Sequence, residues 1–219
     1  MRGMDSMLDV FLVGPIVGIM SAADVLLHLY LDVKKLNDRP SYMREPLVRV
    51  GRLTLFTVGF PTLLCFAIVF LISVAGPLSL TDTVIATMLP IADPPVYVWL
   101  PGLGLLSAGI ILHAWSRWAR KNNASSWEMR EDQQLVKDGP YSRVRHPSYT
   151  SYMLSFVGLL LMIPSVATIM LLVGLPGYYF VSLVEEQHLI HHFGDDYENY
   201  VLETGRFLPV FRRRRRMRS

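Results

Sequence analysis

The chain has 219 residues, of which 52% are hydrophobic and only 18% charged, and its mean hydropathy is +0.35. This length suits one domain, and the composition excludes an ordinary soluble globular protein. The formal net charge is +3, and the single cysteine, Cys65, excludes an intrachain disulfide and a cysteine-based metal cluster. We therefore expect an integral membrane protein.

Four apolar stretches with almost no charge lie at residues 10–31, 51–75, 96–118 and 149–185. A helix crosses about 30 Å of hydrocarbon with roughly 20 residues, so the last stretch is too long for one span. A turn at Ile163, Pro164 and Ser165 would divide it into two helices, the first of them short. Basic residues follow the first stretch where a secretory signal would have its cleavage site, so we expect a span there. The sequence thus predicts an all-α polytopic fold with about five transmembrane helices.

The distribution of lysine and arginine predicts the orientation, because these residues are retained in the cytoplasm. Of the 21 basic residues, 20 fall in the loop after the first span, in the segment before residue 146, or in the tail from Arg206. The connection at 76–95 carries Asp82 and Asp93 but no lysine or arginine. We expect an N-out, C-in topology with the polar segments on the cytoplasmic side.

The terminal run of arginines at 212–216 concentrates positive charge in a short tail. No aromatic stacking pattern accompanies it, which argues against a nucleic-acid partner. Anionic lipids at the inner membrane surface are the expected partners, since each basic residue near that surface contributes about 1 kcal/mol. The alternative is a tail that only fixes the topology.

The most informative segment reads DGPYSRVRHPSY, at residues 138–149, and it directly precedes an apolar run. Arg145 and His146 stand before Pro147, which is a natural first helical residue. About 36 residues later, across the predicted hairpin, come the paired carboxylates Glu185 and Glu186. A cation, an imidazole and two acids are therefore expected together where helices meet the membrane border.

These two blocks, QQLVKDGPYSRVRHPSY and EEQHLIHHFGDDYENYVLETGRFLP, resemble the isoprenylcysteine carboxyl methyltransferase family and, more loosely, the phospholipid N-methyltransferases. The resemblance covers the chain from about residue 105 onward. It implies a polytopic membrane enzyme that transfers a methyl group from S-adenosylmethionine in a non-Rossmann site facing the cytoplasm. Residues 1–95 would then be N-terminal spans and loops, and 96–219 the methyltransferase core of one structural domain.

The resemblance also implies which residues hold the cofactor. The family's cofactor-binding positions fall on Gln133, Gln134, Leu135, Val136, Tyr141, His146, Pro147, Ser148, Tyr149 and Glu185. Glu185 can take the cofactor's ammonium, and the amides of the helix beginning near Pro147, with Arg145, can face its carboxylate. Tyr141 and Tyr149 suit the sulfonium cation, and Leu135 and Val136 the adenine.

Arg145, His146, Glu186 and Arg206 are the expected catalytic residues. A lipophilic acceptor would enter from the membrane, with a carboxylate as the first expectation and a thiol or amine as alternatives; the latter two need a base such as His146. Two positions depart from the family pattern. Ser151 stands where glycine is usual, and Val181 stands where the eukaryotic enzymes place a substrate-binding arginine, which leaves the acceptor open.

Each motif residue also has an ordinary structural interpretation. Arg145 could be an interfacial anchor, Tyr149 part of an aromatic belt, and the two glutamates a solvated helix end. His188, His191 and His192 share one helix face, but the family needs no metal, so we expect a basic helix end and no metal site. His28 and His113, each alone in a span, are expected to be satisfied core residues.

Two other function classes compete with methyl transfer. A membrane reductase of the sterol-reductase type also carries an RHP-x-Y block, although the pair Glu185 and Glu186 argues against it. A non-catalytic scaffold would act through its basic tail alone.

Overall fold

The computed structural model describes residues 4–37, 50–75, 78, 80–120 and 134–210, and its regular elements there are all helices. The long helices are α1 (Met4–Asn37), α2 (Arg52–Ala75), α4 (Val96–Arg120) and α7 (Gly174–Phe193). The shorter ones are α3 (Thr81–Thr87), η1 (Gly139–Ser142), α5 (Pro147–Met162), α6 (Val166–Met170), η2 (Leu171–Val173) and α8 (Asp195–Glu203). The described part contains isolated β-bridges but no strand, which confirms the all-α prediction.

Four segments are long and apolar enough to cross a membrane: Gly14–Lys34, Arg52–Ala75, Val96–Arg120 and Val166–Phe193. Many of their large apolar side chains are exposed, among them Leu53 at 76% and Leu63 at 71%, as lipid contact requires. Four of the predicted spans are thereby found as helices that are long and apolar enough to cross a membrane. Helix α5 has 16 residues and is about 24 Å long, which is short of a full crossing. The fifth span and the N-out, C-in orientation stay predictions.

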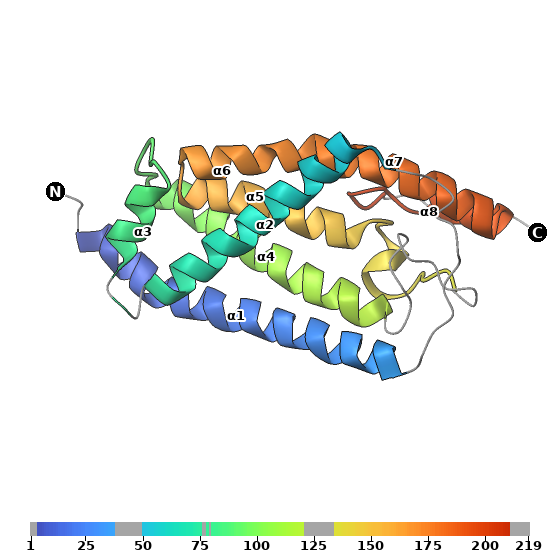
Figure 1. Ribbon diagram of the computed structural model, residues 1–219, viewed down its shortest axis with the longest axis horizontal. Helices are drawn as coiled ribbons and strands as arrows, with labels where there is room; N and C mark the ends of the chain where they lie inside the picture. Colours follow the sequence, from blue (N-terminus) through green and yellow to red (C-terminus); the bar gives the residue numbers. More distant parts are fainter. Residues whose placement is uncertain (1–3, 38–49, 76–77, 79, 121–133, 211–219) are drawn as a thin grey trace, which may run out of the picture.

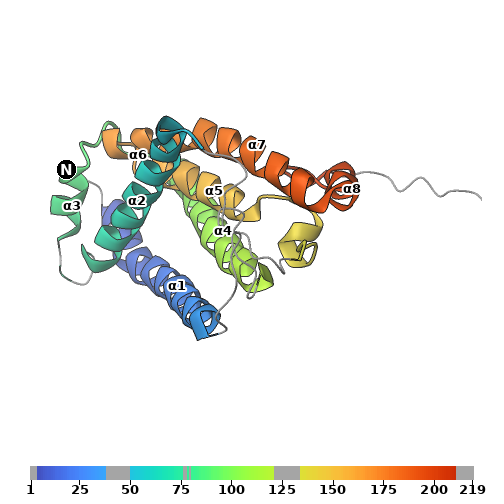
Figure 2. The ribbon, with the colours of Figure 1, turned by 45° about the vertical axis from the view of Figure 1, so that its right-hand side comes forward.

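Helices α4 and α5 form the centre of the bundle, with α1 on one side and α7 on the other (Figure 1, Figure 2). Small residues let the two central helices approach closely. A Cβ on Gly109 would lie 2.4 Å from Ser155 Oγ and 2.7 Å from Ser151 O. Ser151 itself is 1% exposed, so the serine that replaces the family's glycine keeps the close packing.

The predicted hairpin turn lies between the end of α5 at Met162 and the start of α6 at Val166. Ser165 caps α6 in a capping box with Thr168, each side chain bonded to the other's backbone amide. A short 3-10 segment, η2, then joins α6 to α7, where Pro176 removes the amide that Leu172 O would otherwise accept. The chain therefore returns to the level at which α5 began, and Glu185 and Glu186 reach the start of α5.

Helix α1 runs beside α4 and ends at the same end of the bundle (Figure 1). Arg117 Nη2 donates to Asp32 Oδ1 at 2.6 Å and ties the ends of the two helices together. This end also carries η1 and α8, so the polar segments gather there. Three segments that carry basic residues lie outside the described residues: 38–49, 121–133 and the tail 211–219. The predicted contact of the tail with anionic lipids therefore stays a prediction.

Candidate active site

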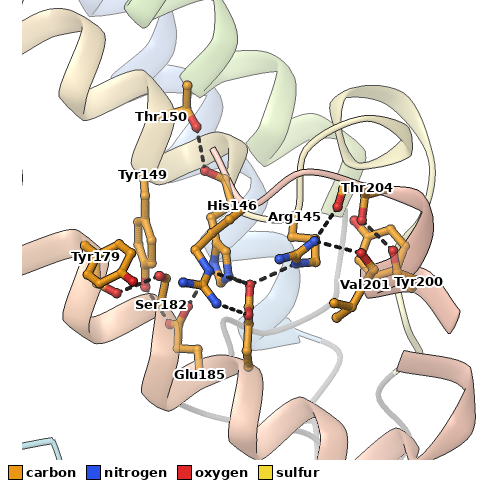
Figure 3. A network of polar contacts seen from close by, with 12 residues as sticks. Arg145, His146, Tyr149, Thr150, Tyr179, Ser182, Glu185, Tyr200, Val201 and Thr204 are labelled. Carbon is orange, nitrogen blue, oxygen red and sulfur yellow. Dashed lines mark hydrogen bonds and ion pairs between the residues drawn. The ribbon is translucent and has the colours of Figure 1, made fainter. Parts of the chain in front are cut away.

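The centre of the site is His146, the N-cap residue of α5, whose ring lies between the two glutamates of α7. His146 Nδ1 lies 3.4 Å from Glu185 Oε2, and Nε2 lies 3.2 Å from Glu186 Oε1. All three residues are buried, with 5 to 7% of their surface exposed. The two sequence blocks therefore meet across the hairpin, and we call Arg145, His146, Glu185, Glu186 and Arg206 the central site (Figure 3).

Two arginines compensate the charge of Glu186. Arg145 Nε donates to Glu186 Oε1 at 2.8 Å, while Arg206 donates from Nε to Oε1 at 3.0 Å and from Nη2 to Oε2 at 2.6 Å. The Arg206 contact is a two-bonded arginine–carboxylate pair, which fixes geometry as well as charge. Glu186 is thus buried, so its interpretation as a solvated helix end is wrong, and Arg145 is bound within the protein.

The segment after α8 lies against the motif through backbone bonds. Arg145 N donates to Gly205 O at 2.8 Å, His146 N to Arg206 O at 3.0 Å, and Gly205 N to Arg143 O at 3.1 Å. Thr150 Oγ1 adds a bond to Phe207 O at 3.0 Å. A Cβ on Gly205 would lie within 3 Å of the backbone of Leu208, so the segment folds back at a position that only glycine fits. The GRFL residues thereby cover the site.

Helix α8 packs against Arg145 and η1 and holds them in place. Arg145 Nη1 donates to Val201 O at 3.2 Å and also to Thr204 O, which satisfies the end of α8. Tyr200 Oη donates to Tyr141 O at 2.6 Å and ties η1 to α8. The Arg145 side chain therefore joins α5, α7 and α8.

An aromatic wall continues from the central site along α5. The ring of His146 stacks on Tyr149 with centroids 5.4 Å apart, and Tyr149 packs on Tyr178 at 4.7 Å. Tyr149 Oη donates to Glu185 Oε1 at 2.5 Å, so this tyrosine is no ordinary member of an aromatic belt. Buried π-faces beside a carboxylate suit a ligand that carries a cation.

Two opposing effects set the protonation of His146. Burial alone would lower the pKa of the imidazole, but the hydrogen bonds and charges of Glu185 and Glu186 outweigh it and raise the pKa above 6.5. Arg145 and Arg206 balance the charges of the two carboxylates, so the net charge of the central site depends on the protonation of His146.

The remaining predicted residues lie around this centre. Pro147 is buried at the first position of α5, and Ser148 Oγ lies 2.8 Å from Ser116 Oγ of α4. Tyr141 is half-buried in η1, and Leu135 and Val136 are half-buried in the segment leading to it, where Gln134 is exposed. Gln133 lies outside the described residues. The structure thus brings eight predicted residues into one region: Arg145, His146, Pro147, Ser148, Tyr149, Glu185, Glu186 and Arg206.

The sequence did not indicate that the end of α4 lies beside the predicted site residues Tyr141 and Ser148. Arg120 is close enough to Tyr141 to interact electrostatically, and Ser116 contacts Ser148. Arg117 and Arg120 stand three residues apart at the end of a predicted span, a spacing that could have indicated a shared helix face.

Three buried polar atoms on α4, α7 and α8 have no hydrogen-bond partner in the part of the chain that the structure describes. They are Arg120 Nε, His188 Nε2 and Tyr197 Oη. His188 interacts electrostatically with Glu185, and Tyr197 with Glu186 and Arg145. Buried polar groups normally have partners, so donors, a carboxylate and aromatic faces here fit a zwitterionic, cation-bearing cofactor.

A second polar cluster lies deeper in the bundle. His28 and His113 stack with centroids 4.6 Å apart, and His113 Nδ1 lies 2.8 Å from Asp24 Oδ2. His28 Nδ1 also lies 3.0 Å from the Asp24 backbone oxygen, so both histidines have hydrogen-bond partners, as expected, and both find them at one acid of α1. Within the described residues, these three bring possible metal-ligand atoms within 4.8 Å of one another, whereas His191 of the histidine cluster on α7 is exposed.

Two comparisons with known proteins bear on this arrangement. Residues 98–196 match the family model described as phospholipid methyltransferase. Over 82 residues the chain is 33% identical to the protein-S-isoprenylcysteine O-methyltransferase of Schizosaccharomyces pombe. That match covers 36% of this chain and 35% of the relative, so the similarity spans about a third of the relative's length. The family match contains the motif and the glutamates but neither α1 nor α2.

Proposed function

Because the chain is related to the membrane methyltransferase family of the phospholipid and isoprenylcysteine enzymes, we propose that it transfers a methyl group from S-adenosylmethionine to a lipophilic acceptor. The observation that carries the proposal is His146 held between Glu185 and Glu186, with Arg145 and Arg206 on Glu186. This constellation joins, in space, the two blocks on which the resemblance rests.

The residues that would hold the cofactor follow from their chemistry. Glu185 would bind its ammonium, and the start of α5, which has no side-chain cap, would face its carboxylate. Tyr149 and the rings packed on it would line the positive sulfur. When bound, S-adenosylmethionine supplies the electrophilic methyl group; the protein aligns the acceptor with it and excludes water.

We propose a carboxylate as the acceptor atom. A carboxylate needs no base because it is ionised near neutral pH, whereas an ammonium would first have to lose a proton. Val181 is fully buried on α7 and offers no donor, so this chain must bind an acceptor anion through other residues.

The cytoplasm-facing orientation of this site is part of the proposal. The water-soluble cofactor would enter from that side, while the acceptor would reach the site laterally from the bilayer. The exposed apolar side chains on α2 and α4 are consistent with lipid around the bundle.

The test is a transfer assay with detergent-purified protein and methyl-labelled S-adenosylmethionine. N-acetyl-S-farnesylcysteine supplies a prenylated carboxylate, and phosphatidylethanolamine vesicles supply a lipid amine. We expect lipid-extractable label on the prenylated cysteine, released as methanol in base because the product is an ester. Transfer only to the amine would refute the carboxylate, and no transfer together with NADPH binding would favour the reductase.

A further inference from the structure

A hydrogen-bonded triad lies inside the membrane-spanning part of the bundle, apart from the central site. Its members are Asp24 of α1, His113 of α4 and Tyr152 of α5. His113 Nδ1 lies 2.8 Å from Asp24 Oδ2, and His113 Nε2 lies 2.8 Å from Tyr152 Oη. Three helices therefore meet through one imidazole ring whose two nitrogens are both engaged.

Such a triad is costly at membrane depth, which argues that it has a function. Asp24 lies within the span Gly14–Lys34 and is only 6% exposed, and ionisable groups placed there generally serve function. Asp24 Oδ1 has no hydrogen-bond partner in the described part of the chain. A purely structural contact between α1 and α4 would need neither the acid nor the histidine, because apolar side chains pack as well.

The geometry favours a hydrogen-bond relay over a metal site. The rings of His28 and His113 are stacked with an angle of 11° between their planes, so their in-plane lone pairs run side by side and do not converge on one point. Zinc sites need ligand atoms that converge tetrahedrally. Both nitrogens of His113 already face an oxygen, and that arrangement orients Tyr152.

The triad is joined to the central site by an aromatic stack. Tyr152 stacks on Tyr178 at 5.4 Å with an 11° angle between the rings, and Tyr149 packs on the same Tyr178. Tyr149 and Tyr152 stand three residues apart and so share a face of α5, about 4.5 Å apart along its axis. Tyr149 contacts Glu185, whereas Tyr152 lies about one turn further along α5, away from the polar end of the bundle.

We propose that the Tyr152 hydroxyl hydrogen-bonds the carboxylate of the acceptor, with His113 and Asp24 as positioning residues. When His113 is the imidazolium paired with the Asp24 carboxylate, it donates from Nδ1 to Asp24 and from Nε2 to the Tyr152 oxygen, and the Tyr152 O–H is left to donate onward. A chain of hydrogen bonds of this kind strengthens its terminal donor. This inference rests on the proposed function, and it supplies the anion-binding donor that Val181 does not offer.

The proposal also gives α1 a role in the site. Asp24 lies outside residues 98–196, the part that matches the family model. Helix α1 would therefore contribute to the acceptor site a residue that the family match does not include. A second polar link between the same helices, Asp32 to Arg117, lies at the end of the bundle, where Asp32 is 60% exposed. Asp32 is therefore a matched control, because it pairs α1 with α4 without touching the triad.

The test compares Tyr152→Phe, Asp24→Asn and Asp32→Asn in the purified full chain. The probes are N-acetyl-S-farnesylcysteine and phosphatidylethanolamine vesicles as acceptors, and S-adenosylhomocysteine as the cofactor-site ligand. For the prenylated cysteine we expect KM to rise at least tenfold in Tyr152→Phe and several-fold in Asp24→Asn. The Kd for S-adenosylhomocysteine should stay within twofold of wild type in both, and Asp32→Asn should match wild type throughout.

Each other outcome overturns the proposal. An unchanged KM in Tyr152→Phe removes the hydroxyl as an acceptor donor, and equal effects of Asp24→Asn and Asp32→Asn reduce the triad to a helix contact. If Tyr152→Phe lowers kcat for phosphatidylethanolamine and leaves its KM unchanged, Tyr152 acts as a base for an amine and not as a hydrogen-bond donor to a carboxylate. If Tyr152→Phe loses S-adenosylhomocysteine binding, the isosteric Asp24→Asn takes its place as the test variant. A KM for the prenylated cysteine that is unchanged in Asp24→Asn then overturns the proposal. A wild type that transfers methyl to neither probe fails the proposed function itself, and this inference with it.

Discussion

Glu186→Gln tests whether the buried charge network holds the site together. Gln keeps the shape of the side chain and removes the charge that compensates Arg145 and Arg206. Breaking a buried ion pair costs about 3–5 kcal/mol, and since the Arg206 side chain is 25% exposed we expect about 3 kcal/mol. For a chain of this length that corresponds to a fall of about 6–12 °C in Tm.

The assay is thermal unfolding in one detergent at fixed protein concentration. Glu198→Gln on the exposed side of α8 is the matched control and should leave Tm within about 1 °C of wild type. Limited proteolysis of the segment after α8 should also become faster in Glu186→Gln, because Arg206 loses its partner. Equal Tm values for the two variants would refute the assignment of Glu186 as the centre of the network.

Three further outcomes are expected. Gly205→Ala should weaken S-adenosylhomocysteine binding at least tenfold in calorimetry, because the added Cβ meets the Leu208 backbone; unchanged affinity would show that the covering segment is dispensable. The pKa of His146 is raised, so its contribution to stability is fully present below about pH 6.5 and is lost as pH rises through the raised pKa; His146→Gln should flatten that part of the Tm–pH profile. Gly109→Leu should prevent recovery of folded protein in size-exclusion chromatography, because α4 and α5 cannot separate to admit it, whereas Gly104→Leu, with open space around it, should be recovered normally.

Hydropathy predicted the helices because lipid leaves the backbone few alternatives to a helix. The turn at Ile163 to Ser165 followed from one apolar stretch that was too long for a single span, and the structure places it there. Hydropathy could not give the length of α5, since Pro147 and the capped turn at Ser165 fix its ends. It also could not show that α6, η2 and α7 continue as one candidate span across Pro176.

The part of the central site that lies in one continuous motif, Arg145 and His146, could be predicted from the sequence. His146 and Glu185 were expected to meet because a hairpin returns the chain to its starting level. The contact of Arg206 with Glu186 was not predicted, since Arg206 reaches it through a segment that folds back after α8. The pairing of Asp24 with His113 spans 89 positions between helices that are not consecutive, and no periodicity in the sequence encodes such a contact.

The central claim is that His146 and the glutamates of α7 form a cofactor site, and calorimetric titration with S-adenosylhomocysteine tests it most directly. We predict that the wild-type chain binds and that Glu185→Gln weakens binding at least tenfold, or about 1.4 kcal/mol, while Glu198→Gln binds as wild type. Wild-type affinity in Glu185→Gln, or no binding by the wild-type chain, would contradict the account.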